Sequence, residues 1–412
     1  DLGEFPRGKI PTPNMAEGSR SAEAAAASAG HPHELAAEAA ALVARMSLEE
    51  KASLCSGASF WSLPSIPRLG LESVMVSDGP HGLRKLGAND HLGTGVSEPA
   101  TCFPSGGTVA ASWDPDLVRA MGDALARECV AQGVSVVLGP AINLKRHPHC
   151  GRNFEYYSED PHLAGQLAAA FVDGAQRVGV GCSLKHFAAN NQARRPQQRH
   201  FHSYGRSRHA LPRHAHQEYM RMRVDTVVDE RTLRELYLPA FETAVTRSQP
   251  WTVMCAYNRL NGSYCSDSAW LLSSVLRREW AFRGLVLSDW AATNSRVAAV
   301  AAGMDLEMPS SGGINDGRVL RAVRDDANPL DAAHLDLCAA RVVALILAAQ
   351  RRRAAAVASG DAAAAGAGTS AALLDANHAF AMRSAVECAV LMKNSGGLLP
   401  LKASAAAAGG GG

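Results

Sequence analysis

The stretch "GLVLSDW" at residues 284–290 joins four residues suited to a buried strand to serine, aspartate and tryptophan. Other segments have the same form, with an apolar run that leads into polar side chains: "VMVSD", "VSVVLGP", "CSLKHF", "TVMCAYN" and "GMDLEMP". The polar residues at or just beyond the ends of these runs are Asp78, Asn143, Lys185, His186, Tyr257, Asn258, Asp289, Trp290 and Glu307. Strands that end alike predict one shared site.

Helical patterns separate these runs. Asp114 and Asp160 each precede a proline, which is a signal for a helix N-cap and first turn. After Asp114, apolar residues recur every four positions and predict a buried helical stripe. The residues of that stripe are Leu117, Met121, Leu125 and Cys129. A third helix is expected near Asp229, with Leu233, Leu236 and Phe241 facing inward.

Alternation of strands and helices over about 260 residues fits a (β/α)8 TIM-type barrel, for which roughly 250 residues is typical. We expect this barrel to allow irregular strands. A doubly wound open sheet is the alternative, but no glycine-rich phosphate turn follows the first strand. In barrels of this kind, the active site forms at the C-terminal ends of the strands, where the polar residues of this chain lie.

The composition excludes several classes of protein. The 412 residues, 47% hydrophobic and 19% charged, suffice for a sizeable core and more than one domain. A formal net charge of +2 argues against a nucleic-acid partner, and the lack of an 18-residue apolar run argues against a membrane span and favours the cytoplasm. Nine cysteines show no metal-type CxxC pairing, so we predict neither a metal nor a cofactor. Oligomeric state is left open.

The domain organisation follows from changes in composition. Residues 1–44 are predicted to be a flexible leader with a helix near Glu34, and residues 45–310 form the barrel. Residues 311–372 are a helical segment and an Ala/Gly-rich linker, with "RRR" at 351–353 as a solvated helix end. Residues 373–412 are predicted to be the truncated start of a second α/β domain, in which a helix from Asn377 leads into a strand within "AVLMKNSGGLLPL".

The predicted site suits a neutral, polyhydroxylated ligand. Carboxylates and basic groups bind hydroxyls in charge-assisted hydrogen bonds, and an indole face stacks on the apolar face of a sugar ring. A carboxylate at a strand end could be a nucleophile, a general acid or a metal ligand. For each aspartate taken alone, the alternative is an N-cap or a structural ion pair.

Several motifs, in order, carry a resemblance. They are "SDGPHGLR" (77–84), "GRNFEYYSEDP" (151–161), "KHFAANNQ" (185–192), "DERTLRELYLPAFE" (229–242), "MCAYNRLNG" (254–262), "GLVLSDW" and "VLMKNSGGLLPL". Their sequence, order and spacing resemble glycoside hydrolase family 3, across about residues 45–310 and again at 377–401. The segment "NLKRHPHCGRNFEYYSEDP" is most similar to the β-glucosidases of that family.

The resemblance implies a role for each matching residue. Asp289 would be the nucleophile of a retaining mechanism, and Trp290 would wall the sugar site. The hydroxyls of the terminal sugar would be bound by Asp78, Arg152, Lys185 and His186, and the pocket would be completed by Arg84, Arg221, Met254 and Tyr257. From the residues themselves, a carboxylate flanked by cations is expected to stay ionised at neutral pH, as a nucleophile must.

Structural alternatives apply to three of these residues. Arg84 and Arg152 could instead be ion-pair partners of Glu155 or Glu159. Met254 could belong to the hydrophobic core, as buried methionines commonly do.

The chain departs from the family pattern in one motif. After Gln192 the family continues directly into a glutamate and, soon afterwards, a sugar-binding arginine. Here residues 193–217 intervene, with six Arg, five His and no acidic residue, and removing those arginines from the net charge of +2 would leave −4. A disordered loop or a translated intron is favoured over an anion-binding or nucleic-acid-binding loop. The insertion leaves the placement of Arg221 open.

A second departure concerns the general acid/base. Family members of this kind usually take that carboxylate from the domain after the barrel, which ends here at its first predicted strand. We therefore expect an exo-acting β-glucosidase-type hydrolase that cleaves terminal β-D-glucosyl residues, with its acid/base apparently missing from this chain. The alternative is a catalytically impaired carbohydrate-binding fragment, and a third, weaker hypothesis makes the basic insertion a nucleic-acid contact.

Overall fold

The computed structural model describes residues 30–86, 95–192, 221–325, 327–328, 330–358 and 368–401. The predicted insertion at 193–217, the first part of the predicted leader and the Ala/Gly-rich segment after residue 401 lie outside these ranges.

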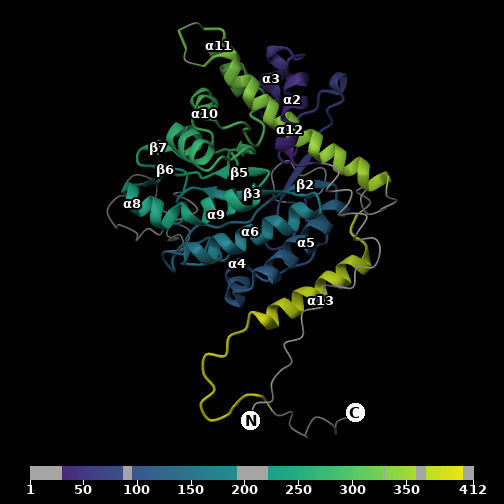
Figure 1. Cartoon of the computed structure of the whole chain (residues 1–412), viewed down its shortest axis with the longest axis vertical. Coiled ribbons are helices and arrows are strands. Elements are labelled where there is room, and N and C mark those ends of the chain that lie inside the picture. Colours follow the sequence, from purple (N-terminus) through teal and green to yellow (C-terminus); the bar gives the residue numbers. More distant parts are fainter. Residues whose placement is uncertain are drawn as a thin grey trace, which may run out of the picture.

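Five parallel strands form the central sheet, in the order β1-β2-β3-β5-β8 (Figure 1). They are β1 (Met75–Asp78), β2 (Val134–Leu138), β3 (Gly181–Phe187), β5 (Thr252–Cys255) and β8 (Leu285–Leu287). Each coincides with a predicted run. Because the strands are parallel, their C-terminal ends meet on one side of the sheet, which is where the polar residues were predicted to gather.

The remaining predicted run, at 303–309, forms no named strand and instead pairs through single bridges, with β8 on one side and with Ser56 on the other. A little further along, Ser62 pairs with β1, so the segment 55–63 connects the two edges of the sheet. The Asp305 carboxylate replaces a main-chain acceptor here, because it receives the backbone N–H of Val286 at 2.7 Å. The barrel fold is confirmed, and its irregularity lies in these two segments.

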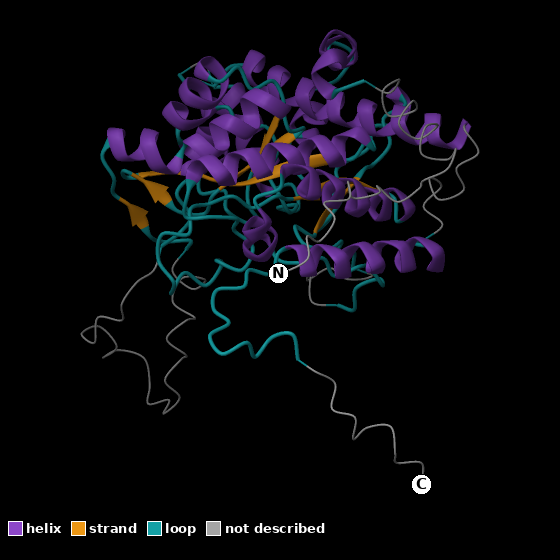
Figure 2. Cartoon of the chain, turned by 60° about the horizontal axis from the view of Figure 1, so that its bottom comes forward, coloured by secondary structure: helices purple, strands orange, loops and turns teal. Residues whose placement is uncertain are grey.

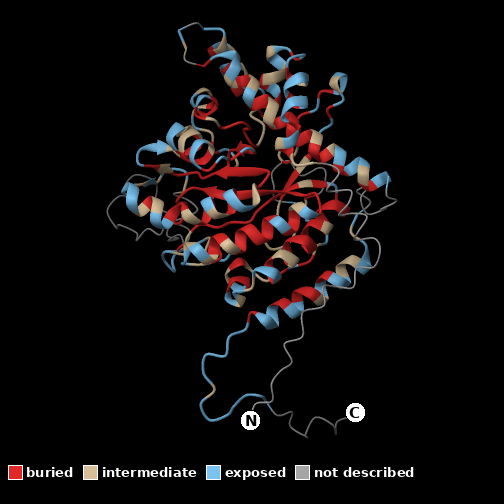
Figure 3. Ribbon diagram, viewed as in Figure 1, coloured by how far each residue is buried: buried red, intermediate tan, exposed pale blue. Residues whose placement is uncertain are grey.

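Helices α5 (Pro115–Ala131) and α6 (Pro161–Arg177) pack against each other and, with α9 (Pro239–Ser248), cover one side of the sheet (Figures 1 and 3). The predicted caps are confirmed: the Asp114 carboxylate accepts from the backbone N–H groups of Asp116 and Leu117, and that of Asp160 from His162. The four residues of the predicted stripe on α5 are all buried.

The helix predicted near Asp229 begins as expected but turns differently. Asp229 caps the short α8 (Glu230–Thr232), which continues as the π-helix η5 (Leu233–Tyr237). The wider π turn advances the buried face by about one position. Tyr237 is consequently buried, whereas Leu236 is 44% exposed, so the prediction that Leu236 faces inward was wrong.

Helices α11 (Ile314–Val323) and α12 (Ala332–Ala358) cover another side of the barrel. α12 has 27 residues and is apolar enough to cross a membrane by length and composition. However, 56% of its most apolar window is buried, against α2, α3 and β8 among others, which is typical of a core helix. The expected absence of a membrane span stays a prediction.

The prediction that the arginines 351–353 form a solvated helix end was wrong. α12 continues to Ala358, so the helix extends into the predicted linker. Arg351 and Arg353 are exposed and pair with Glu38 and Glu72, but Arg352 is only 5% exposed, because it faces the barrel side of the helix.

The predicted leader is partly folded. η1 (Pro32–Leu35), α2 (Ala36–Val43) and α3 (Leu48–Leu54) precede the first strand. Ala39 and Val43 are buried in one hydrophobic cluster with residues of α12 and of the sheet. Residues from Pro32 onward are therefore part of the barrel's hydrophobic packing and not a leader.

The C-terminal described segment holds a helix without the strand that we predicted. α13 (Ala371–Glu387) begins before Asn377, and the Asn377 amide donates to the buried Glu128 of α5 at 2.7 Å. Residues 389–401 form no strand, and the chain leaves the helix as a loop (Figure 2). A strand needs neighbouring backbone groups to bond, and the hydrogen bonds of 389–401 with described residues are all local.

The remaining elements are short connections. A second sheet consists of β4 (Asp225–Thr226), β6 (Arg259–Leu260) and β7 (Ser263–Tyr264). The helical elements are η2 (Pro67–Leu69), α4 (Gly106–Val109), η3 (Ala110–Ser112), η6 (Cys265–Asp267), the π-helix η7 (Trp270–Glu279) and α10 (Arg296–Ala302).

Acid is expected to destabilise the fold through His31, which contacts the residue that ends α9, Gln249. Its imidazole Nε2 lies 2.7 Å from the carbonyl oxygen of Gln249, and burial, followed by the charge of His33, lowers the pKa of His31 to about 4. Between about pH 6.5 and 4 the unfolded chain binds a proton that the folded chain resists, so stability is present above this window and is lost as pH falls through it.

We expect His31→Gln to reduce this acid loss by about 2–3 kcal/mol, on the basis of roughly 1.4 kcal/mol per pKa unit. Urea unfolding of parent and variant at pH 7 and pH 4 measures it. Equal losses in both proteins would show that His31 does not contribute.

Candidate active site

Asp289 lies just beyond β8 and is 7% exposed. Its Oδ1 accepts a hydrogen bond from the backbone N–H of Trp290 at 2.8 Å, and its Oδ2 has no hydrogen-bond partner within the described part of the chain. The His186 Nε2 approaches Oδ2 to 3.6 Å. A buried carboxylate oxygen that is left without a donor is suited to act on a ligand.

The positive charges around Asp289 oppose the effect of burial on its pKa. Burial raises the pKa of the Asp289 carboxyl, and Arg152, Arg221 and Lys185 oppose the rise. The predicted flanking cations are therefore present, but burial has the larger effect. Burial also lowers the pKa of His186 well below its usual range, with the same three cations adding to the shift. His186 is thus neutral at neutral pH, and its approach to Asp289 is not an ion pair.

Lys185 and His186 lie within β3, near its end, and are 3% and 1% exposed. The Lys185 ammonium donates to the Asp78 carboxylate at the end of β1, at 3.3 Å. Arg84 Nη1 lies 3.9 Å from the other oxygen of Asp78. The structure therefore brings Asp78 and Arg84 to Lys185, which lies 107 residues beyond Asp78 in the chain and directly precedes His186.

Asn143 has a role that the strand-end pattern did not predict. Its side-chain amide donates to the carbonyl oxygen of His186 at 2.9 Å and its Oδ1 accepts from the His186 N–H at 2.9 Å. Both hydrogen bonds hold the backbone of one site residue. The only signal in the sequence was a polar residue placed shortly after a strand.

Arg152 combines the two roles considered for it, a structural ion pair and a place beside the site carboxylate. Its Nε pairs with Glu155, which is 3% exposed. Burial would lower the pKa of Arg152, but Glu155, Tyr156 and Asp289 together raise it. The guanidinium therefore has a structural partner and also lies within the field of Asp289.

Arg221 is the first described residue after the insertion, and the structure brings it to the site. Its guanidinium carbon lies 4.3 Å from the centre of the Tyr257 ring. The Tyr257 hydroxyl donates to the carbonyl oxygen of Trp290 at 2.7 Å. Burial and then the charge of Asp289 raise the pKa of Tyr257, so its hydroxyl stays protonated.

An aromatic wall includes two residues that the sequence patterns did not identify. The Trp290 indole N–H donates to the carbonyl oxygen of Phe60 at 3.0 Å, and the Trp290 ring lies 5.2 Å from that of Trp61 and 6.3 Å from that of Phe60. The adjacent aromatic pair in "SGASFW" was the available signal. Met254, by contrast, is 2% exposed and packs in the hydrophobic core, as its alternative proposed.

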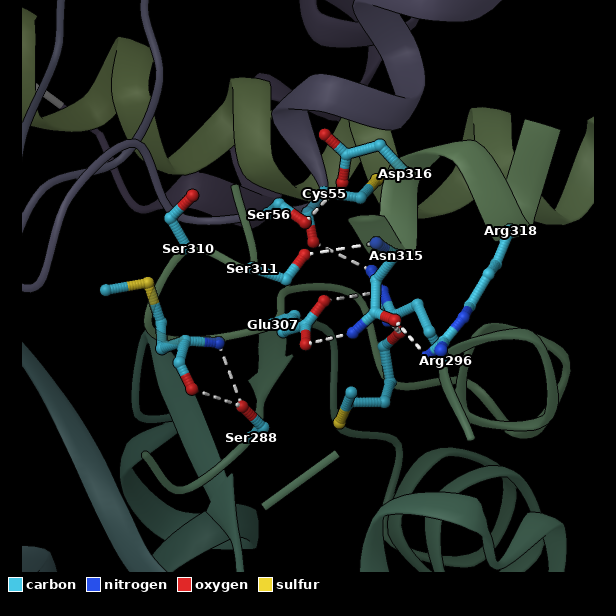
Figure 4. Close-up of polar contacts among 12 residues, drawn as sticks. Cys55, Ser56, Ser288, Arg296, Glu307, Ser310, Ser311, Asn315, Asp316 and Arg318 are labelled. Carbon is cyan, nitrogen blue, oxygen red and sulfur yellow. Dashed lines mark hydrogen bonds and ion pairs between the residues drawn. The ribbon is translucent and has the colours of Figure 1, made fainter. Parts of the chain in front are cut away.

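Glu307 faces a different cluster (Figure 4). Its carboxylate accepts from the Asn315 amide at 2.5 Å and lies 3.9 Å from Nε of Arg296, which is itself buried. Burial raises the pKa of Glu307, and Arg296 opposes the rise. Asn315 thus holds one oxygen of Glu307 beside the loop after residue 308, while Oε2 has no hydrogen-bond partner among the described residues.

These observations define a class of protein: a barrel that gathers one buried carboxylate, several cations and an aromatic wall at the ends of its strands. Among the described residues, no cluster of His, Cys, Asp and Glu could hold a metal ion. The chain belongs to glycoside hydrolase family 3, because the family described as "Glycosyl hydrolase family 3 N terminal domain" matches residues 72–345.

Two similar proteins illustrate the range of names within the family. The chain is 45% identical to the thermostable beta-glucosidase B of Acetivibrio thermocellus over 364 residues, which is 88% of this chain and 43% of that protein. It is 42% identical to the exo-alpha-(1->6)-L-arabinopyranosidase of Bifidobacterium longum over 360 residues, which is 87% of this chain and 42% of that protein.

Solved structures of beta-glucosidases are also similar to this chain. The chain resembles the crystal structure of the Bifidobacterium adolescentis GH3 beta-glucosidase with a TM-score of 0.72 and 41% identity, over 87% of this chain and 46% of that one. It also resembles beta-glucosidase 3B from Thermotoga neapolitana in complex with glucose, with a TM-score of 0.73 and 34% identity, over 88% and 48%. The chain thus spans less than half the length of these relatives.

Proposed function

We propose that this chain carries the sugar site and the nucleophile of a retaining exo-glycosidase that cleaves terminal β-D-glucosyl residues. The proposal is carried by the buried Asp289 oxygen at the end of β8, which has no hydrogen-bond donor among the residues that the structure describes. The names of the relatives and the glucose bound to one similar structure support the choice of sugar.

The proposed chemistry begins with attack of the Asp289 carboxylate on the anomeric carbon. The bond to the leaving oxygen breaks, a proton is delivered to that oxygen, and water later hydrolyses the glycosyl-enzyme. Trp290 would wall the sugar, and Tyr257 would hold the Trp290 backbone. The hydroxyls of the sugar would be bound by Asp78, Arg84, Arg152, Lys185, His186 and Arg221.

We place the general acid/base outside the described residues. Glu307, the other carboxylate at a strand end near β8, is engaged by Asn315 and Arg296. General acid catalysis typically contributes 10²–10⁴-fold. The 412-residue chain is therefore expected to hydrolyse cellobiose very slowly, and to react faster with glucosides whose leaving group needs little protonation.

A slow fluorinated glucoside with a good leaving group tests the proposal. Mass spectrometry should find one fluorinated glucosyl adduct on the peptide that contains Asp289. Added azide should increase its release, because this anion attacks the anomeric carbon without a general base and carries the sugar away as a glycosyl azide. A label on another carboxylate would contradict the proposal. Ordinary turnover of cellobiose would instead show that the chain already contains its acid/base.

Two alternatives are decided by the same experiment. Glucose binding with no adduct would indicate a carbohydrate-binding fragment. The similarity to an arabinopyranosidase makes the α-L-arabinopyranoside the second candidate sugar. A faster reaction with the matching aryl α-L-arabinopyranoside than with the aryl β-glucoside would select it.

A further inference from the structure

Ser288, immediately before Asp289, is fully buried. Its hydroxyl donates to the carbonyl oxygen of Met308 at 3.1 Å and accepts from the Met308 N–H at 2.9 Å (Figure 4). The backbone N–H of Ser288 donates to the carbonyl oxygen of Leu306 at 3.0 Å. A single side chain therefore joins the end of β8 to both backbone groups of one residue.

The turn on the other side of Asp289 is attached to the same place. The N–H of Ala291 donates to the carbonyl oxygen of Met308 at 2.9 Å, and Ala292 donates to the carbonyl oxygen of Asp289 at 3.0 Å. Ala291 has a φ of 59°, which is unfavourable for a residue with a Cβ. The carbonyl of Met308 therefore fixes the chain on both sides of Asp289.

The Met308 anchor is itself immobilised by its neighbours. The N–H of Glu307 donates to the carbonyl oxygen of Cys55, and the N–H of Gly57 donates to that of Glu307, both at 2.9 Å. The Arg296 guanidinium, 3% exposed, binds the carbonyl oxygens of Cys55 and Asp305 at 2.8 and 3.0 Å. The segment that closes the barrel is thus a rigid support for Ser288.

We infer that Ser288 is a positioning residue that holds the Asp289 carboxylate in its attacking geometry through Met308. This inference rests on the proposed function, since it assigns Asp289 the role of nucleophile. Alanine at this position would keep the strand but lose both hydroxyl bonds and leave the buried Met308 N–H without its acceptor. Small displacements of a reacting group are costly, because reactivity depends on near-attack geometry.

The test compares the rate of glycosylation by the fluorinated glucoside in Ser288→Ala and in the parent. We expect the rate to fall at least about tenfold, with the affinity for glucose changed less than about twofold. Ser288→Thr, which keeps the hydroxyl, should recover much of the rate. If the alanine variant does not fold, Ser288→Cys serves, because a thiol has a similar shape but bonds weakly.

Ser183→Ala is the matched control. Ser183 is also fully buried, on β3, but its hydroxyl has no hydrogen-bond partner among the described residues. Its loss should leave the glycosylation rate unchanged. A Ser288→Ala rate within twofold of the parent, or an equal fall in the control, would overturn the inference.

A titration separates this inference from the proposed function. Without any sugar, the carboxyl carbon of Asp289 can be followed by NMR, in the field of Arg152, Arg221, Lys185 and His186. If Ser288 positions the carboxylate, its loss should let water reach Asp289 and move the pKa back toward the ordinary value. If the parent forms no adduct, the proposed function fails and this titration alone decides: an unchanged pKa overturns the inference.

Discussion

Replacing Asp289 with asparagine is expected to reduce formation of the glycosyl-enzyme by about a thousandfold or more, because an amide cannot replace the carboxylate as nucleophile. The fold should not suffer. Burial raises the pKa of Asp289, so the folded state favours the protonated carboxyl, and ionisation reduces stability as pH rises through that pKa. Asparagine is never charged, so the free energy of unfolding at pH 7 should be equal to that of the parent or greater.

Adduct mass and urea unfolding measure these two effects in the same samples. Asp267→Asn is the control, since Asp267 is a nearby carboxylate already bonded to Ser266 and Asn294. It should be labelled at the rate of the parent. If Asp289→Asn still forms the adduct, the nucleophile lies elsewhere, and a large loss of stability would show that the charged carboxylate supports the fold.

Replacing Asp305 with alanine is expected to destabilise the barrel by about 3–5 kcal/mol, because it removes the carboxylate that two partly buried guanidinium groups share. Asp305 is fully buried. Its Oδ2 accepts from Arg277 at 2.7 Å and from the N–H of Val286 at 2.7 Å, and its Oδ1 accepts from Arg341 at 2.8 Å. One carboxylate therefore joins η7, α12 and β8. Burial already lowers the pKa of Arg277, and the Asp305 charge opposes that shift.

The shift in urea midpoint, converted to free energy, measures the loss. Asp331→Ala provides the control, because the Asp331 side chain is 68% exposed and its pairing with His334 is at the surface. The exposed pair contributes about 0–1 kcal/mol. The Asp331 carboxylate also accepts the backbone N–H of His334 at the start of α12, a helix cap worth about 1 kcal/mol, so this variant should lose clearly less stability than Asp305→Ala. Equal losses of unfolding free energy in the two variants would show that the buried hydrogen bonds of Asp305 do not stabilise the fold.

The parts of the fold that depend on neighbouring residues could be predicted from the sequence. Asp114 and Asp160 cap their helices because the carboxylate reaches N–H groups two or three positions away. The strands likewise followed from short apolar runs. The burial of Leu236 was predicted wrongly, because a π turn changes the helical period and nothing in the local pattern reported it.

The motifs also indicated which residues gather at the strand ends, Asp289 among them, because parallel strands place their C-terminal ends together whatever their sequence separation. How those residues meet depended on the whole chain. Asn143 holds His186, and Arg221 covers Tyr257, through contacts that no local pattern encodes. These pairings exist because the barrel closes.

The sequence by itself therefore determined the family, the barrel and the position of Asp289 at the end of β8, since these depend on local pattern and on motifs in order. Only the tertiary structure decided the electrostatic state of the site. Asp289 has a raised pKa and His186 a strongly lowered one because packing by distant segments removes water from both side chains. The cations were visible in the sequence, but the burial that outweighs them was not.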